Sequence, residues 1–365
     1  MKKNDKLSLR RLSALLLALC LSLGLAACGK PAAESSAPPA DNSKAVESAA
    51  PAESQAPEKL MDQPITFNMG FSSAADSAVG KAMQSACDAI TERTNGEVQF
   101  KLFPNGQLGS TTEVLEQMRA GAPVICALGF DNMGDYVPKM QIASAPYVFN
   151  DTHEVQVLGD SDWMKETEKD MREAGFAPLG YGSWGYRHFI STKPIEDASS
   201  IKGMLVRMGN SSLAQNFITV MGGSPTTSAW NDNYSNLSQG IYDACEASAE
   251  LLYNSSLYEV ANYLTLSGHF VTPTVMTMNT TCWDKLPEAY QQIVREEISK
   301  GMAAILDEMT ASEADYIQKF KDAEVTVIET DKSTFSAYVP ELLTKLGLDA
   351  AEYDNIRAAI EAGQK

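Results

Sequence analysis

The stretch GYGSWGYRHF, Gly180–Phe189, is either a dinucleotide-binding turn of an α/β protein or a crossing between two strands. Its glycines satisfy G-x-G-x-x-G, the spacing of a dinucleotide-binding turn, which must end a strand and open a helix whose N-terminus receives the pyrophosphate. The residues that follow Gly185 are YRHFIS, which are mostly aromatic or β-branched and run into Thr192-Lys193-Pro194. This composition predicts an extended strand rather than a helix. We therefore interpret the glycine spacing as accidental and the stretch as a strand crossing.

Strands and helices alternate on both sides of this stretch. Apolar periodicity predicts the strands ITFNM, VQFKLF, VICALGF, APLGY, MLVRM, VTPTVMTM and VTVI. It predicts helices at Ala78–Arg93, Thr111–Ala120, Ser212–Met221 and Trp283–Lys321. The last helix is interrupted only by Gly301 and, at ~1.5 Å per residue, is long enough to bridge two lobes. The sequence therefore predicts an α/β chain.

The first 27 residues have the pattern of a signal peptide. The apolar run Leu12–Ala27, which is too short to span a membrane comfortably, follows five basic residues: Lys2, Lys3, Lys6, Arg10 and Arg11. The run ends in LAAC, Leu25–Cys28, which resembles the lipobox of bacterial lipoproteins. In those proteins the cysteine thiol receives a diacylglyceryl group. A plain secretory peptide with an incidental cysteine is the alternative.

Residues 28–61 are predicted to be a lipidated cysteine followed by a disordered tether. The segment Gly29–Lys59 consists mostly of Ala, Ser, Pro, Glu and Lys, so it cannot bury enough apolar surface to become ordered. Two or more acyl chains would anchor the protein to the outer face of the cytoplasmic membrane. The formal net charge of -18 becomes more negative without the basic signal peptide, which argues against nucleic acid as a partner.

The chain carries no recognisable catalytic or metal-binding motif. It has no G-x-S-x-G, no P-loop and no CxxC pair. Three widely spaced histidines are predicted to be surface or capping residues: His153, His188 and His269. Four cysteines are predicted to be buried thiols, with one or two disulfides as the alternative: Cys87, Cys126, Cys245 and Cys282. The sequence therefore predicts a protein that is not an enzyme and that needs no cofactor or metal.

Five segments between Ile65 and Val294 form a family pattern. They are FPNGQLGSTTEVLEQMRAG, APYVFNDTHE, GYRHF, IKGMLVRM and SPTTSAWNDNYSNLSQGIYDACEAS, in this order. Together they resemble the solute-binding proteins of tripartite ATP-independent periplasmic (TRAP) transporters, the dicarboxylate-binding-protein-like family. The resemblance implies a two-lobed periplasmic-binding-protein-like fold, with a ligand cleft between the lobes and a long bridging helix.

The resemblance also suggests how the chain divides between the lobes. We expect residues 62–184 and 274–312 to form lobe I, and residues 185–273 and 313–365 to form lobe II. The glycine-rich stretch would then be a crossing between the lobes.

Two arginines are the first candidates for ligand binding. The resemblance implies that Arg207, in MLVRM, is the ligand arginine and that Arg187 enters the cleft just after the glycine-rich stretch. A guanidinium group can bind a carboxylate through two parallel hydrogen bonds, a geometry that lysine lacks. A salt bridge to one of the acidic residues of the chain is the alternative role for each arginine.

Four further residues are weaker candidates. Trp230 occupies the aromatic position of the family and could cover the apolar face of a ligand, with core packing as the alternative. Tyr234, four residues later, would share a helical face with it and add a hydroxyl donor. Gln107 is expected in a turn near the cleft. Ala247 stands where the family has a ligand-orienting asparagine, and Asn231 or Asn233 could fill that gap.

One further departure from the family pattern, besides Ala247, limits what can be inferred about the ligand. Ala244 replaces a family glycine, and Glu246, which keeps the acidic position, is expected to have a structural role. The resemblance therefore implies an extracytoplasmic receptor that captures a small carboxylate and delivers it to a TRAP permease, without identifying the acid. A sensory lipoprotein that presents the liganded form to a signalling partner is the alternative.

Overall fold

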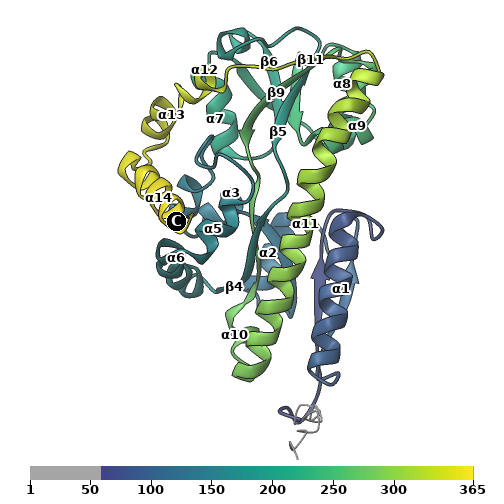
Figure 1. Ribbon diagram of the computed structural model, residues 1–365, viewed down its shortest axis with the longest axis vertical. Coiled ribbons are helices and arrows are strands. Elements are labelled where there is room, and N and C mark those ends of the chain that lie inside the picture. The colour runs from purple at the N-terminus through teal and green to yellow at the C-terminus, as the bar shows by residue number, and fades with distance from the viewer. Residues whose placement is uncertain (1–58, 365) are drawn as a thin grey trace, which may run out of the picture. The chain divides into compact units, whose positions relative to one another are not determined.

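The computed structural model describes residues 59–364 of the 365-residue chain. The predicted signal peptide, Cys28 and most of the predicted tether lie outside the described residues. Within the described range, no helix is both long enough and apolar enough to cross a membrane. This part of the chain forms two β-sheets with helices packed against them (Figure 1).

The first sheet has five strands in the order β2-β1-β3-β10-β4. Strand β1 pairs in parallel with β2 and β3, and β10 runs antiparallel between β3 and β4. Every residue of β10 is buried, which explains why its sequence, PTVMTMN, does not alternate between apolar and charged side chains. The strands are β1 (Ile65–Gly70), β2 (Val98–Phe103), β3 (Val124–Gly129), β4 (Phe176–Ser183) and β10 (Pro273–Asn279).

The second sheet has six strands in the order β11-β9-β5-β8-β6-β7. Strand β6 pairs in parallel with β7 on one side and β8 on the other, and β5 runs antiparallel between β8 and β9. The strands are β5 (Arg187–Ser191), β6 (Leu205–Met208), β7 (Ser224–Thr227), β8 (Ala244–Ala247), β9 (Tyr263–Phe270) and β11 (Thr326–Ile328). The chain passes between the two sheets three times: from β4 to β5, from β9 to β10, and from β10 through the helices that follow it to β11.

The helices have the following bounds. Those before β5 are α1 (Ala78–Arg93), α2 (Thr111–Arg119), α3 (Phe130–Gly134), α4 (Pro138–Ile142), α5 (Glu154–Asp160) and α6 (Asp162–Glu173). Those between β5 and β11 are η1 (Ala198–Ile201), α7 (Ser212–Val220), η2 (Trp230–Asp232), α8 (Asn233–Ser238), α9 (Ala249–Asn254), η3 (Leu257–Glu259), α10 (Thr280–Trp283) and α11 (Glu288–Asp322). The chain ends with α12 (Lys332–Ser336), α13 (Val339–Leu346) and α14 (Ala350–Gly363).

The long helix α11 packs against elements of both sheets. It contacts α1 and β4 over one part of its length and α9 and β11 over another (Figure 1). The prediction that it begins at Trp283 is wrong, because Pro287 separates it from the short α10. Gly301 does not interrupt it either. A Cβ atom at Gly301 would lie 2.7 Å from Cε of Met83 on α1, so this glycine allows the two helices to approach closely.

The glycines of GYGSWGYRHF have a packing role. Gly180 and Gly182 lie in β4, where added Cβ atoms would come within 3.1 Å of Ser299 Oγ and Met302 Cε on α11. Gly185 has a φ of +85°, which favours glycine, in the turn that leads into β5. The stretch therefore ends one strand and begins another, and the prediction of a strand crossing without a phosphate-binding turn is confirmed.

The histidine prediction is wrong for two of the three residues, and the cysteine prediction is confirmed. His188 and His269 are buried, whereas His153 is exposed. His269 stacks on Phe189 with ring centroids 4.3 Å apart, and its Nδ1 forms a 2.8 Å hydrogen bond with Ser267 Oγ. Aromatic stacking and one hydrogen bond allow a neutral imidazole to be buried. Cys87, Cys126, Cys245 and Cys282 are all buried free thiols.

Candidate functional site

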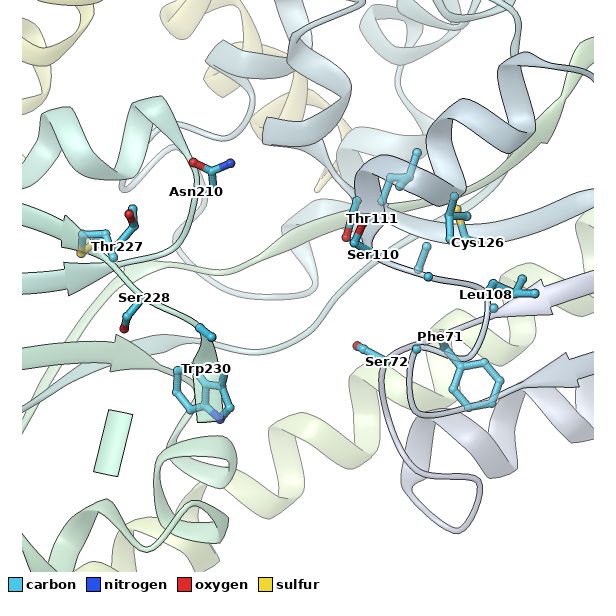
Figure 2. Close-up of a pocket in the computed structure, with 18 of the residues that line it drawn as sticks. Phe71, Ser72, Leu108, Ser110, Thr111, Cys126, Asn210, Thr227, Ser228 and Trp230 are labelled. Atoms are coloured by element: carbon cyan, nitrogen blue, oxygen red, sulfur yellow. The ribbon is translucent and has the colours of Figure 1, made fainter. Parts of the chain in front are cut away.

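A cleft of about 950 Å³ opens where strands of both sheets end. Residues that follow β1 and β2 and the end of β3 form one wall, and residues at the ends of β6 and β7 form the other. Figure 2 shows Ser72, Leu108 and Thr111 on one side and Asn210 and Trp230 on the other. The carboxyl ends of parallel strands are the usual place for ligand binding in open α/β sheets.

Arg207 contributes the only charge among the described residues that line this cleft. It lies on β6, next to the edge strand of the second sheet, between Thr226 of β7 and Cys245 of β8, and its relative exposure is 8%. Its Nη2 donates a 2.8 Å hydrogen bond to the carbonyl oxygen of Ser228. Its Nε is buried and has no hydrogen-bond partner among the described residues.

Trp230 holds the Arg207 side chain from one side. The guanidinium carbon lies over the indole ring, 5.3 Å from its centroid. The ring is oriented by a 3.0 Å hydrogen bond from Trp230 Nε1 to Ser255 Oγ. In residues 59–364 no carboxylate forms an ion pair with Arg207, so its charge is not neutralised by the protein. A buried, unpaired cation is costly, and an anionic ligand would remove that cost.

A second cavity of about 430 Å³ adjoins the cleft and shares Thr111 and Asn210 with it. Arg187 lines this inner cavity together with Glu246. Arg187 Nη2 donates a 2.8 Å hydrogen bond to Glu246 Oε1 and a 3.1 Å bond to the Glu246 carbonyl oxygen. Arg187 Nε donates to Glu246 Oε2. The salt bridge considered as the alternative for Arg187 is therefore present.

In the Arg187–Glu246 pair, Glu246 is buried and Arg187 is half-buried. Burial by itself would raise the pKa of Glu246, but the Arg187 charge and its hydrogen bonds lower that pKa well below its ordinary value. His269 Nε2 lies 3.6 Å from Glu246 Oε2. Burial lowers the pKa of His269, and the attraction of Glu246 only partly opposes this. The site therefore contains an ionised carboxylate and a neutral histidine at neutral pH.

The remaining candidates lie in different surroundings. Trp230 lines the cleft, whereas Tyr234 is exposed and its hydroxyl donates a 2.9 Å hydrogen bond to Glu259 Oε2. The expected shared helical face is wrong, because Trp230 lies in the short η2 and Tyr234 in α8. Gln107 and Asn231 are exposed and line neither cavity. Their participation in binding stays a prediction.

Asn233 does not lie in either cavity. Its side chain is buried, its Oδ1 accepts a hydrogen bond from the Tyr242 hydroxyl, and its Nδ2 has no partner among the described residues. Ala247 is buried in β8, opposite His188 of β5. Whether an asparagine compensates for Ala247 in ligand binding stays a prediction.

The sequence analysis missed several polar residues that line the two cavities. They are Ser72, Ser110, Thr111, Thr227 and Asn210 in the cleft, and Asp131, Asn132, Asp135 and Ser211 in the inner cavity. Many of them follow the carboxyl end of a strand closely. Parallel strands bring their carboxyl ends to one edge of a sheet. The polar residues just after VICALGF and MLVRM could therefore have been predicted to line a ligand site. Among the described residues, no group of three or more His, Cys, Asp or Glu could hold a metal ion.

Comparisons with known proteins agree with this arrangement. Residues 69–346 match the sequence profile of the bacterial extracellular solute-binding protein family 7 (DctP). A solute-binding protein of Chromohalobacter salexigens is 28% identical over 290 residues, which covers 78% of this chain and 85% of that protein.

Two solved structures are similar along their whole length. A TRAP periplasmic solute-binding protein of Actinobacillus succinogenes with bound L-galactonate has a TM-score of 0.74 and 29% identity, covering 82% of this chain and 100% of the other. A TRAP periplasmic solute-binding protein of Sulfitobacter sp. NAS-14.1 with bound β-D-galacturonate has a TM-score of 0.73 and 28% identity, covering 81% of this chain and 99% of the other. The predicted two-lobed α/β fold is confirmed by these similarities.

Proposed function

Because this chain belongs to the bacterial extracellular solute-binding protein family 7, the receptors of TRAP transporters, we propose that it captures a sugar acid through Arg207. It is a solute-binding receptor, not an enzyme, and it works outside the cytoplasm with a TRAP permease. The resemblance noted in the sequence is therefore confirmed. Membership of this family does not favour the alternative of a sensory lipoprotein.

One observation carries the proposal for the ligand. Arg207 is a buried guanidinium group in a cleft of about 950 Å³, and no acidic residue of the described chain neutralises it. A ligand carboxylate would supply the missing charge and accept charge-assisted hydrogen bonds. A free thiol, hydroxyl or amine at that position would not.

The rest of the cleft suits a hydroxylated ligand. The Trp230 ring offers an apolar surface, and hydroxyl and amide groups are available on Ser72, Thr111, Thr227 and Asn210. The similar receptors bound to L-galactonate and β-D-galacturonate hold acids of this type. We infer that the cleft closes around such an acid, which would exclude water and strengthen the interaction with Arg207.

Titration calorimetry on the chain from Cys28, carrying Cys28→Ser to prevent lipidation, tests this proposal. Galacturonate, glucuronate and galactonate are compared with galactose, which has no carboxylate. We expect at least one acid to bind and galactose not to bind. Arg207→Lys loses the bidentate geometry, so we expect it to weaken the free energy of acid binding by about 1.5–3 kcal/mol. This corresponds to roughly 10- to 150-fold in affinity.

Arg295→Lys serves as a matched control, because Arg295 lies on α11, lines neither cavity and packs over Trp283. An Arg207→Ala protein that remained folded and bound the acid as tightly as the parent would contradict the proposal. Wild-type protein that bound no acid in the panel would contradict it too.

We also propose that Cys28 is lipidated and anchors the receptor to the membrane, since LAAC has the lipobox pattern. Two or more acyl chains give stable anchoring where one is marginal. In cell fractionation we expect the wild-type protein in the membrane fraction and Cys28→Ala in the soluble fraction. Equal retention of both proteins in the membrane would show that Cys28 is not the anchor.

A further inference from the structure

The two connected cavities carry opposite charges. The cleft is lined by one charged residue, Arg207. The inner cavity is lined by three carboxylates and one guanidinium group: Asp131, Asp135, Glu246 and Arg187. Because Thr111 and Asn210 line both cavities, a ligand anchored at Arg207 can extend from the positive region into the negative one.

Arg187 does not give the inner cavity a free positive charge. Its Nε and Nη2 both donate to the carboxylate of Glu246, and Nη2 also donates to the Glu246 carbonyl. Burial would lower the pKa of Arg187, but Glu246 raises it above its ordinary value and Asp131 acts in the same direction. Asp131 and Glu246 line the same cavity as Arg187, so two carboxylates there face one guanidinium group.

Asp131 lines the inner cavity beside Arg187, whose guanidinium group already donates to the Glu246 carboxylate. It lies in the first turn of α3, directly after β3, and is half-buried. Its Oδ1 occupies the space beside Gly129 that a Cβ atom would fill, so glycine at that position makes room for the carboxylate. Within residues 59–364 no lysine or arginine side chain hydrogen-bonds to Asp131.

We propose that the receptor selects monocarboxylic sugar acids over dicarboxylic ones, and that Asp131 is the residue that determines this selectivity. This inference rests on the proposed function, since it requires one ligand carboxylate at Arg207. The far end of the ligand then meets Asp131, which accepts hydrogen bonds from hydroxyl groups and repels a second carboxylate. A dicarboxylic acid would need a second free cation, and the described lining of the two cavities offers none.

L-Galactonate and galactarate are a matched pair for the test, because they have the same six-carbon skeleton and differ only in a terminal hydroxymethyl or carboxylate group. D-Gluconate and D-glucarate form a second pair of the same kind. Affinities are measured by titration calorimetry at pH 7.5 and fixed salt, with the chain from Cys28 carrying Cys28→Ser. We expect the monocarboxylate of at least one pair to bind ~10-fold or more tightly than its dicarboxylate.

Asp131→Asn keeps the size of the side chain and removes its charge. We expect this variant to bind the dicarboxylate more tightly than the parent does, so that the ratio between the two acids falls by ~5-fold or more. Asp354→Asn is the control, because Asp354 is exposed on α14 and lines neither cavity. That variant is expected to keep the parental ratio.

The outcomes separate this inference from the proposed function. If the wild-type protein binds galactarate or glucarate as tightly as the matched monocarboxylate, selectivity is overturned while the role of Arg207 stands. An unchanged ratio in a folded Asp131→Asn protein removes Asp131 as its cause. If no acid binds, or binding does not depend on Arg207, the proposed function itself fails and the inference fails with it.

Discussion

Glu246 accepts two side-chain hydrogen bonds from Arg187, whereas no carboxylate of the described chain neutralises Arg207. We therefore expect the two arginines to have different roles, although both line adjoining cavities. A guanidinium group that the protein already neutralises contributes to folding and to the shape of the cavity. One that the protein leaves unpaired is available for an anionic ligand.

The first prediction concerns the stability that the Arg187–Glu246 pair provides. Glu246 is buried but Arg187 is only half-buried, so Glu246→Gln leaves a partly solvated charge without its partner, and we expect it to lower the free energy of unfolding by about 1–3 kcal/mol. Urea unfolding at pH 7, followed by circular dichroism, measures this loss. Glu259→Gln is the control, since Glu259 pairs with the exposed Tyr234 and its loss should cost less than about 1 kcal/mol.

The same pair predicts a pH dependence. Since the pKa of Glu246 is lower in the folded than in the unfolded chain, the unfolded chain binds more protons at mildly acidic pH. The contribution of Glu246 is therefore complete above its unfolded pKa of about 4.3, and it declines as the pH falls towards the lower folded value. Unfolding free energies measured between pH 7 and pH 3 should fall less steeply for Glu246→Gln than for the parent. Parallel curves would contradict this assignment.

The second prediction separates Trp230 from Tyr234, two residues that the sequence suggested as ligand contacts. Trp230 lines the cleft over Arg207, so Trp230→Ala should weaken acid binding by about 1–2 kcal/mol. Trp230→Phe keeps a ring and should lose less. Tyr234 is exposed and bound to Glu259, so Tyr234→Phe should leave the affinity unchanged within error.

Titration calorimetry with the tightest acid of the panel gives these affinities, and the melting temperature of each variant shows that it is folded. An effect of Tyr234→Phe as large as that of Trp230→Ala would show that the hydroxyl reaches the ligand after closure. It would also support the sequence-based assignment of Tyr234, which stays a prediction.

The sequence was sufficient to predict some of the long helices, although α14 (Ala350–Gly363) was not predicted. Helix α1 has the predicted bounds, Ala78–Arg93, because apolar residues recur every three or four positions after the N-cap Ser77. Strand β9, YLTLSGHF, was missed although it has eight residues, and so were β7 and β8. The sequences of β7 and β8, SPTT and ACEA, are only four residues long, and one contains proline while the other contains a buried glutamate. Such short strands are defined by their neighbours in the sheet rather than by their own composition.

The candidate site could likewise be predicted only in part from the sequence. The motif around Arg207 could be recognised along the chain, but the partner of Arg187 is 59 positions away, and no local pattern identifies it. Asp131 is separated from Arg187 in sequence and becomes its neighbour only when β3 and β5 approach at the inner cavity. Contacts of this kind depend on the order of strands in the two sheets, which propensity and periodicity do not determine.

The third prediction tests the close packing of the long helix. A Cβ atom at Gly301 would lie 2.7 Å from Cε of Met83 and 3.3 Å from Cβ of Ala86, both on α1. Gly301→Ala gains helix propensity but must displace the end of the flexible Met83 side chain, so we expect a change in unfolding free energy within about 1 kcal/mol. Gly301→Leu must separate the two helices and should cost about 1–3 kcal/mol or more.

Ala304→Leu, at an exposed position three residues further along α11, is the matched control and should change stability by less than about 0.5 kcal/mol. Stability is measured by urea unfolding of the chain from Cys28 carrying Cys28→Ser. Because α11 packs against elements of both sheets, we expect the parent protein to unfold in a single transition. If Gly301→Leu is as stable as Ala304→Leu, the α1–α11 contact is not close-packed. If Gly301→Leu instead unfolds in two steps, Gly301 is also needed for the cooperativity between the elements that α11 contacts.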